Sequence, residues 1–212
     1  MYYLDALRII QTEIQPNNYF EIGCEYGESL CLAKCQSIAV DPEFKITHQL
    51  VNPTRLFKMT SDEFFMQHQV KNILNGPIDL AFIDGMHKAE YALRDFMNIE
   101  KNSHPGTIVI IDDVLPQKIE WASREKQTPE WTGDVYKTIN ILRTYRSDLE
   151  ISVIDIEFKG MGIITNTNCF SDTLSEKYTA IENEILSSEY DLYSAEEVRN
   201  SMNPIDITDF YD

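Results

Sequence analysis

The sequence predicts an α/β fold with a mostly parallel seven-stranded sheet, helices on both faces and a helical C-terminal tail. Short apolar runs alternate along the chain with stretches whose apolar residues recur at helical spacing, which is the pattern of repeated strand and helix units. Acidic residues and glycines follow several of the apolar runs, at the positions where an open parallel sheet binds its ligands. The length of 212 residues fits one such sheet.

The first predicted element is a helix at the N-terminus. Tyr3, Leu7, Ile10 and Ile14 recur at helical spacing, and a proline follows and ends the pattern. We therefore predict a helical segment within residues 1–16, ahead of the first strand.

Seven short apolar runs come next and are predicted to be strands. Runs of this length are typical of strands that are buried in a parallel sheet. The predicted strands cover residues 19–23, 37–41, 55–60, 78–84, 106–113, 151–156 and 161–165.

Helical stretches are predicted between most of these strands. Residues 91–101 and 135–145 carry apolar side chains at helical spacing, as crossover helices do. The stretch from 115 to about 130 is the only long connection inside the core, which makes it a candidate lid over a binding site.

Beyond residue 168 the sequence predicts an acidic helical extension that packs on the same domain. The main domain then covers residues 1–168 and the extension residues 169–212. Two capping boxes indicate helix starts, one at Thr173 with Glu176 and one at Ser194 with Glu197. An apolar stripe follows the first box, at Leu174, Tyr178, Ile181 and Ile185.

Composition and charge exclude several classes of function. The formal net charge of −17 disfavours nucleic acids as substrates, because affinity for phosphate backbones rests on Lys and Arg. Neither a signal peptide nor a membrane span is recognisable, so we expect a soluble, cytoplasmic protein that does not bind membranes. The four cysteines form no C-x-x-C pair and are expected to be buried, reduced thiols.

Glycines and carboxylates end the first two predicted strands. Glu21, Gly23 and Gly27 form an E-x-G-x-x-x-G pattern, and Asp41 ends the second strand. Glycines let the backbone turn sharply and approach a ligand closely, and a carboxylate can accept hydrogen bonds from both ribose hydroxyls of an adenosine. The pattern predicts a nucleoside-type cofactor, and both NAD and S-adenosylmethionine satisfy it.

The glycine spacing favours S-adenosylmethionine. A dinucleotide site has the pattern G-x-G-x-x-G, whereas three bulky residues separate Gly23 from Gly27 here. Glu21 and Glu25 flank the same turn, and two carboxylates suit the positively charged amino and sulfonium groups better than a pyrophosphate.

At these residues, and at the sequence Phe82-Ile83-Asp84-Gly85-Met86-His87, the chain resembles the class I S-adenosylmethionine-dependent methyltransferases. These proteins have a Rossmann-like fold, and the closest resemblance is to their methyltransferase-24-like subgroup. It covers roughly residues 17–165.

The resemblance implies a role for each residue of the cofactor site. Glu21, Gly23 and Gly27 would lie against the methionine part of the cofactor and Asp41 would hold its ribose. Ser61 and Asp62 would approach the adenine, and Asp84 would complete the set.

Carboxylates and a histidine follow the fourth and fifth predicted strands. Asp84, His87, Asp112 and Asp113 would meet if these strands are neighbours in the sheet. Three carboxylates suit a hard cation such as Mg²⁺, which gives Asp84, Asp112 and Asp113 as metal ligands. His87 and Asp84 are then the catalytic pair, with His87 taking the proton from a substrate hydroxyl. The alternative for Asp112 and Asp113 is a strand-end turn or a helix cap.

Metal-dependent catechol-type O-methyltransferases look similar at this point of the chain. They place an Asp at the end of the fourth strand, a basic residue three positions later, and an Asp followed by an amide residue at the end of the fifth. Here the basic position is His87 and the amide position is Asp113. The extra carboxylate favours Ca²⁺ or Mn²⁺ over Mg²⁺.

Trp131 and Asp134 are candidate substrate contacts at the end of the candidate lid. Residues 131–137 resemble a segment of methyltransferases that are found with sugar-modifying enzymes, and Trp faces and carboxylates bind sugars well. The alternative is that Asp134 caps the following helix and Trp131 packs against it.

The function predicted from the sequence is methylation of a hydroxyl on a small molecule, such as a sugar or a glycosylated metabolite, with S-adenosylmethionine as cofactor and a divalent cation such as Mg²⁺ as a candidate aid. One alternative is a dinucleotide-dependent oxidoreductase of the NAD type. The other is an inactive cofactor-binding module that serves as a partner subunit. The sequence is also compatible with assembly into a homo-oligomer.

Overall fold

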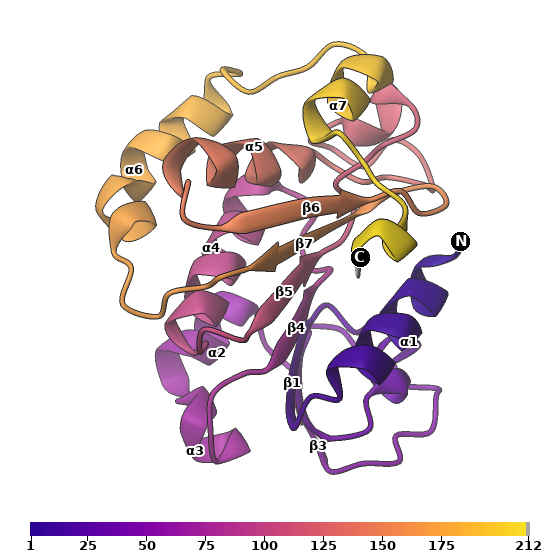
Figure 1. The fold of residues 1–212 in the computed structure, drawn as a ribbon, viewed down its shortest axis with the longest axis vertical. Coiled ribbons are helices and arrows are strands. Elements are labelled where there is room, and N and C mark those ends of the chain that lie inside the picture. The colour runs from indigo at the N-terminus through magenta and orange to yellow at the C-terminus, as the bar shows by residue number, and fades with distance from the viewer. Residues whose placement is uncertain (211–212) are drawn as a thin grey trace.

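Seven strands form a single sheet in the computed structural model, which describes residues 1–210 (Figure 1). Their order across the sheet is β3-β2-β1-β4-β5-β7-β6, and all neighbouring pairs are parallel except β5 with β7 and β6 with β7. The strands are β1 (Asn18–Ile22), β2 (Gln36–Val40), β3 (Thr54–Phe57), β4 (Leu80–Ile83), β5 (Ile108–Ile111), β6 (Glu150–Ile154) and β7 (Met161–Thr165).

The predicted α/β class, the mostly parallel sheet and all seven strands are confirmed. Six of the seven predicted strands run one to three residues past the observed C-terminal end, because the mostly polar residues that follow each apolar run already belong to the turn. The helices are α1 (Tyr3–Ile14), α2 (Ser61–Gln67), α3 (Val70–Leu74), α4 (Ala89–Lys101), α5 (Tyr136–Tyr145), α6 (Thr173–Leu186) and α7 (Ala195–Met202), with short 3-10 turns η1 (Leu30–Leu32), η2 (Ile119–Ala122) and η3 (Ile207–Phe210).

The two faces of the sheet carry unequal layers (Figure 1). Side chains alternate along a strand, so Phe20 and Tyr19 of β1 belong to different cores. Phe20 packs in the larger core, with the buried faces of α2 to α7. Tyr19 packs in the smaller core, with α1, η1 and η3. Between β1 and β2 the chain forms only turns and η1, so α1 covers the face where a crossover helix could have packed.

The C-terminal extension packs on α4 and α5. Arg143 of α5 donates hydrogen bonds to the carbonyl oxygens of Ser201 and Met202, at 2.8 and 3.0 Å. The predicted stripe of α6 is buried at Leu174, Ile181 and Ile185. The domain boundary at residue 168 stays a prediction.

Neither of the two predicted capping boxes forms in full. Helix α6 begins one residue earlier than a Thr173 cap requires, with Asp172 at the N-cap, and no side chain caps it. The Asp172 carboxylate instead pairs with Lys101, at 2.5 Å. Ser194 does cap α7, because its hydroxyl accepts a hydrogen bond from the backbone N–H of Glu197 at 3.1 Å.

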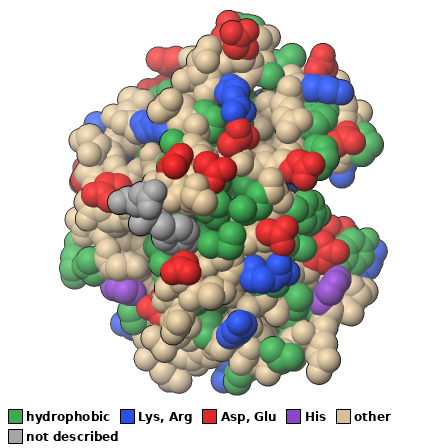
Figure 2. Space-filling view, turned by 45° about the vertical axis from the view of Figure 1, so that its right-hand side comes forward, with side chains coloured by type: hydrophobic (Ala, Val, Ile, Leu, Met, Phe, Trp, Pro, Cys, Tyr) green, Lys and Arg blue, Asp and Glu red, His purple; other side chains and the backbone are tan. Residues whose placement is uncertain are grey.

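The cysteines and the surface complete the description of the fold. All four cysteines are free thiols, but only Cys24 is buried and the others are half-buried, so the prediction of buried thiols holds for Cys24 alone. Acidic side chains lie across the face shown in Figure 2, with basic side chains between them and a hydrophobic group near the centre. No helix among residues 1–210 has the length and apolar character needed to cross a bilayer.

Candidate active site

The carboxyl ends of β1, β4 and β5 meet at one edge of the sheet. In the observed register Ile22 lies beside Ile83, and Ile83 beside Ile111. The residues that follow, Gly23, Asp84 and Asp112, therefore begin the loops at this edge. The prediction that the fourth and fifth strands are neighbours is confirmed.

Gly23 allows the first loop to lie directly on the end of β4. Its φ is +80°, and a Cβ at this position would lie 1.8 Å from the carbonyl oxygen of Asp84. Any other residue would have to move one of the two backbones, so the structure explains the requirement for glycine here. Gly27, also at positive φ, turns the loop below the side chain of Ile46.

Glu21 lies completely buried beneath this loop. Its carboxyl accepts hydrogen bonds from the Tyr19 hydroxyl at 2.6 Å and from the Ser29 hydroxyl at 2.8 Å. Burial raises the pKa of Glu21 to about 8, against the opposing effect of these two hydrogen bonds. Its placement against the methionine part of a cofactor stays a prediction.

Asp41 fastens the glycine loop to the end of β2. One carboxylate oxygen accepts hydrogen bonds from the backbone N–H groups of Cys24 and Glu25, at 3.0 and 2.9 Å, and the other accepts from Glu43 at 2.7 Å. No helix follows Asp41, so this carboxylate does not cap one. Each carboxylate oxygen can accept more than one hydrogen bond, and the ribose contact stays a prediction.

Ser61 and Asp62 begin α2 and are held by α4. Arg94 binds the Asp62 carboxylate with two hydrogen bonds of 3.2 and 2.9 Å. The Ser61 hydroxyl hydrogen-bonds with the carboxyl of Asp95, which is buried and lies near Gly85. The adenine contact predicted for this pair is untested.

Asp95 makes the stability of the fold depend on pH. Burial raises the pKa of Asp95 to about 7. Because the pKa in the folded protein exceeds that in the unfolded chain, the stabilising effect of this group is complete below about pH 4 and is lost as the pH rises through about 7. Asp95→Asn should therefore gain roughly 2 to 3 kcal/mol of unfolding free energy, relative to the wild type, between pH 5 and pH 8.

Urea unfolding of both proteins at the two pH values measures this gain. Asp5→Asn is the matched control, since Asp5 is exposed and pairs only with Arg8 on the surface of α1. A difference between wild type and Asp95→Asn that stays the same at pH 5 and pH 8 would contradict the assignment.

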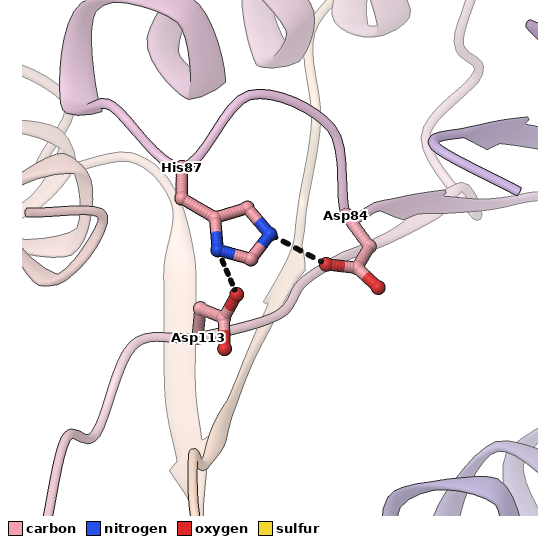
Figure 3. A group of neighbouring side chains, drawn as sticks. All are labelled: Asp84, His87 and Asp113. Atoms are coloured by element: carbon pink, nitrogen blue, oxygen red, sulfur yellow. Dashed lines mark ion pairs between the residues drawn. The ribbon is translucent and has the colours of Figure 1, made fainter. Parts of the chain in front are cut away.

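His87, Asp84 and Asp113 form a cluster at the same edge of the sheet (Figure 3). The Nε2 atom of His87 lies 3.4 Å from a carboxylate oxygen of Asp84. Its Nδ1 atom lies 2.9 Å from an oxygen of Asp113 and 2.9 Å from the carbonyl oxygen of Trp131. Burial alone would lower the pKa of His87, but the hydrogen bonds with Asp113 and Asp84 outweigh it and raise the pKa to about 11.

Asp113 adopts a backbone conformation that is rare for a residue with a side chain. Its φ is +66°, in the left-handed region, directly after β5. Strain of this kind is held in place by the surrounding structure and gathers at functional sites. Here it accompanies the carboxylate that contacts His87.

The structure gathers only two of the three predicted metal ligands, Asp84 and Asp113, in one cluster. The donor atoms that lie within 4.8 Å of one another belong to Asp84, His87 and Asp113, and Asp112 is not in this group. The buried Oδ1 of Asp112 has no hydrogen-bond partner among the described residues, and burial raises the pKa of Asp112 well above its ordinary range.

Two residues of the site could not be found from the sequence pattern. Lys159, in the turn between β6 and β7, places its ammonium 3.0 Å from the second carboxylate oxygen of Asp113. Tyr3, at the start of α1, is half-buried, and its pKa is raised by burial and by the charge of Asp84. Neither residue follows a motif, and both reach this edge only because β6, β7 and α1 pack beside it.

The donors of the cluster fit a divalent cation by chemistry. Two carboxylates and an imidazole suit Mn²⁺ or another transition ion better than Mg²⁺, which prefers oxygen ligands. Both oxygens of Asp113 are already paired, one with His87 and one with Lys159. A cation would have to share or displace these partners.

Asp134 is a structural residue, which corrects the prediction that it contacts substrate. It is buried, one oxygen accepts the backbone N–H of Ala89 at 2.9 Å, and the other pairs with Arg124 at 2.5 Å and Lys137 at 3.2 Å. It thus holds the start of α4 rather than capping α5. The alternative prediction, that Asp134 caps a helix, is therefore correct, but the helix is α4 and not α5.

Trp131 packs on the catalytic candidate. Its ring stacks on the ring of His87, with centroids 5.0 Å apart and planes 21° from parallel. Gly133 makes this approach possible, since a Cβ there would lie 1.6 Å from the carbonyl oxygen of His87. A direct substrate contact of Trp131 is untested.

The candidate lid is anchored at several points. Trp121 is buried, and Arg124 forms ion pairs with Glu90 and Asp134, at 2.6 and 2.5 Å. The Trp131 indole donates to the carbonyl oxygen of Ser123 at 2.5 Å. These contacts favour a fixed wall of the site over a loop that opens widely.

Comparisons with known proteins agree with this architecture. A family model described as a methyltransferase domain matches residues 20–114. No curated protein sequence matches the chain.

Solved methyltransferase structures are similar in fold. The O-methyltransferase TomG from Streptomyces achromogenes, involved in tomaymycin synthesis and solved with S-adenosylmethionine, has 16% identity and a TM-score of 0.59, covering 78% of this chain and 80% of its own. An O-methyltransferase from Bacillus cereus, solved with S-adenosylhomocysteine, has 17% identity and a TM-score of 0.58, covering 77% and 80%. The methyltransferase PaMTH1 from Podospora anserina, bound to S-adenosylhomocysteine, has 12% identity and a TM-score of 0.58, covering 78% of each chain.

The matched domain spans β1 to β5, which carry the glycine loop and the Asp84 cluster. Strands β6 and β7 lie outside the matched domain and complete the seven-stranded sheet of this chain. Residues 20–114 thus match a methyltransferase domain, and the chain shares its fold with solved S-adenosylmethionine-binding methyltransferases.

Proposed function

We propose that this protein is a class I S-adenosylmethionine-dependent methyltransferase that transfers the methyl group of the cofactor to a hydroxyl oxygen of a small molecule, with His87 as the base. The observation that carries the proposal is the position of His87, between Asp84 and Asp113 at the edge where the glycine loop meets β4. The two similar structures named O-methyltransferases, one bound to S-adenosylmethionine and one to S-adenosylhomocysteine, support it.

The hydrogen bonds of His87 decide which nitrogen acts. Both atoms near Nδ1 are acceptors, an oxygen of Asp113 and the carbonyl of Trp131, so Nδ1 carries a proton. In neutral His87 the lone pair is then on Nε2, which faces Asp84. Nε2 takes the proton of the acceptor hydroxyl, while Asp113 and the stacked Trp131 hold the ring in place.

The carboxylates of the site suit a positively charged methyl donor. S-adenosylmethionine supplies a methyl group that is already activated as a sulfonium, so the protein mainly aligns the reacting atoms and excludes water. Glu21 lies below the glycine loop and Asp84 at its side. A cation beside these carboxylates lowers the cost of keeping them charged in a buried place.

The cation and the acceptor are finer parts of the proposal. A divalent ion such as Mg²⁺ or Mn²⁺ would lower the pKa of the acceptor hydroxyl and fix its direction. Asp84 and Asp113 are its candidate ligands, without the predicted Asp112, and Nε2 of His87 serves as the base instead of a ligand. The proposed acceptor is a sugar or a glycosylated metabolite. The Trp131 ring beside His87 supports this choice, whereas Asp134 is engaged with Ala89 and gives no support.

Calorimetric titration with S-adenosylhomocysteine tests the proposed function first. We expect saturable binding of S-adenosylhomocysteine and none of NAD, which separates methyl transfer from the oxidoreductase alternative. Incubation with methyl-labelled cofactor and a panel of sugars and phenols then tests for transfer to oxygen. Absence of S-adenosylhomocysteine binding would overturn the proposal, and binding without transfer to any acceptor would favour the inactive module.

A further inference from the structure

Lys159 is held rigidly beside the carboxylates by its own backbone. It lies between Phe158 and Gly160, which both have positive φ, at +78° and +64°. The carbonyl oxygen of Lys159 accepts a hydrogen bond from the backbone N–H of Leu115 at 2.6 Å, just beyond β5. A Cβ on Gly160 would lie 2.3 Å from Cβ of Leu115, so the turn packs tightly on the chain after Asp113.

The ammonium of Lys159 is the fixed positive charge of this edge. Its side chain is 32% exposed and lies 3.0 Å from Asp113. Lys159 therefore neutralises negative charge on Asp113 that a bound divalent cation would otherwise neutralise.

The space beside the cluster admits only one small occupant. The pocket lined by Asp84, His87, Asp112 and Asp113 measures about 10 Å³, which is the room of about one water molecule. Asp112, which lines this pocket, has a buried Oδ1 without a hydrogen-bond partner among the described residues. The site thus combines the unsatisfied oxygen of Asp112, a pocket of about 10 Å³ and the ammonium of Lys159.

We propose that Lys159 competes with a divalent cation for Asp113, so that the ion binds Asp84 and Asp113 only when the ammonium leaves. This inference rests on the cation part of the proposed function and assigns Lys159 the control of metal affinity. Two positive groups cannot both approach one carboxylate closely without repelling each other, and the repulsion is strong in a partly buried site.

Titration of the full chain with Mn²⁺, followed by the electron paramagnetic resonance signal of the free ion, tests the competition. Lys159→Met should bind Mn²⁺ at least tenfold more tightly than the wild type, because it removes one positive charge close to the ligands. Lys159→Arg, which keeps the charge, should stay near the wild type. Lys71→Met makes the same charge change on the exposed side of α3 and should have no effect.

The outcomes separate this inference from the proposed function. Equal or weaker Mn²⁺ binding in Lys159→Met, or binding by neither protein, would overturn the competition. A thermal unfolding scan checks the fold, and Lys159→Gln is measured as well in case the methionine variant is unstable. Binding of S-adenosylhomocysteine, measured on the same samples, reports on the proposed function independently of the metal.

Discussion

Replacing His87 with alanine is expected to lower the turnover of methyl transfer by about 10²- to 10⁴-fold, which is the usual contribution of a general base. The variant loses the only imidazole of the cluster of Asp84, His87 and Asp113. We expect the affinity for S-adenosylhomocysteine to change little, because the glycine loop and Asp41 do not contact the imidazole. Turnover is measured with the labelled cofactor at a saturating concentration of acceptor.

His104→Ala is a matched control for this variant. His104 also pairs with an aspartate, since its Nε2 lies 2.9 Å from Asp79. Both residues precede strands, so they lie at the opposite edge of the sheet from His87. Turnover in His104→Ala should stay near the wild type, and an undiminished rate in His87→Ala would remove His87 from the role of base.

The pH profile of the wild type gives a second measure of His87. With a pKa of about 11, the imidazole of the ligand-free protein is mostly protonated at neutral pH, and only the neutral form accepts a proton. Below the pKa, the neutral fraction increases about tenfold for each unit by which the pH rises. We therefore expect the turnover to rise with pH above 7. Binding of the positively charged cofactor should lower the pKa of His87 and move this rise to lower pH.

The parts of the fold that follow from local pattern could be predicted from the sequence. Strands such as β7 show as apolar runs, and α1 shows as a stripe at helical spacing. The order of β4 and β5 then brought Asp84, His87 and Asp113 to one edge, as expected. These features need only periodicity and the rule that parallel strands end together.

The parts that depend on tertiary contacts could not be predicted. Asp134 looked like a sugar contact or a cap for the next helix, and instead holds Ala89, 45 residues earlier in the chain. Lys159 sits in a turn where a lysine is normally solvated, and only the packing of that turn on Leu115 brings it to Asp113. Side-chain partners of this kind are set by the fold and leave no trace in local spacing.

Removal of Glu100 is expected to have the largest effect on stability. Arg146 is buried and binds Glu100 with two hydrogen bonds of 2.5 and 2.8 Å, which join the end of α4 to the end of α5. Glu100 also accepts the backbone N–H of Asn168 at 3.1 Å. Glu100→Ala leaves a buried guanidinium with Asp148 as its remaining partner, and should lower the unfolding free energy by about 3 to 5 kcal/mol in urea titration.

The neighbouring residue supplies the control for this last variant. Lys101 pairs with Asp172 on the surface, so Lys101→Ala should cost less than about 1 kcal/mol. A double variant, Glu100→Met with Arg146→Leu, should recover much of the loss, because the cost of breaking a buried pair comes from the unpaired charge that is left behind. A loss in Glu100→Ala no larger than that in Lys101→Ala would show that the pair does not join the two helices.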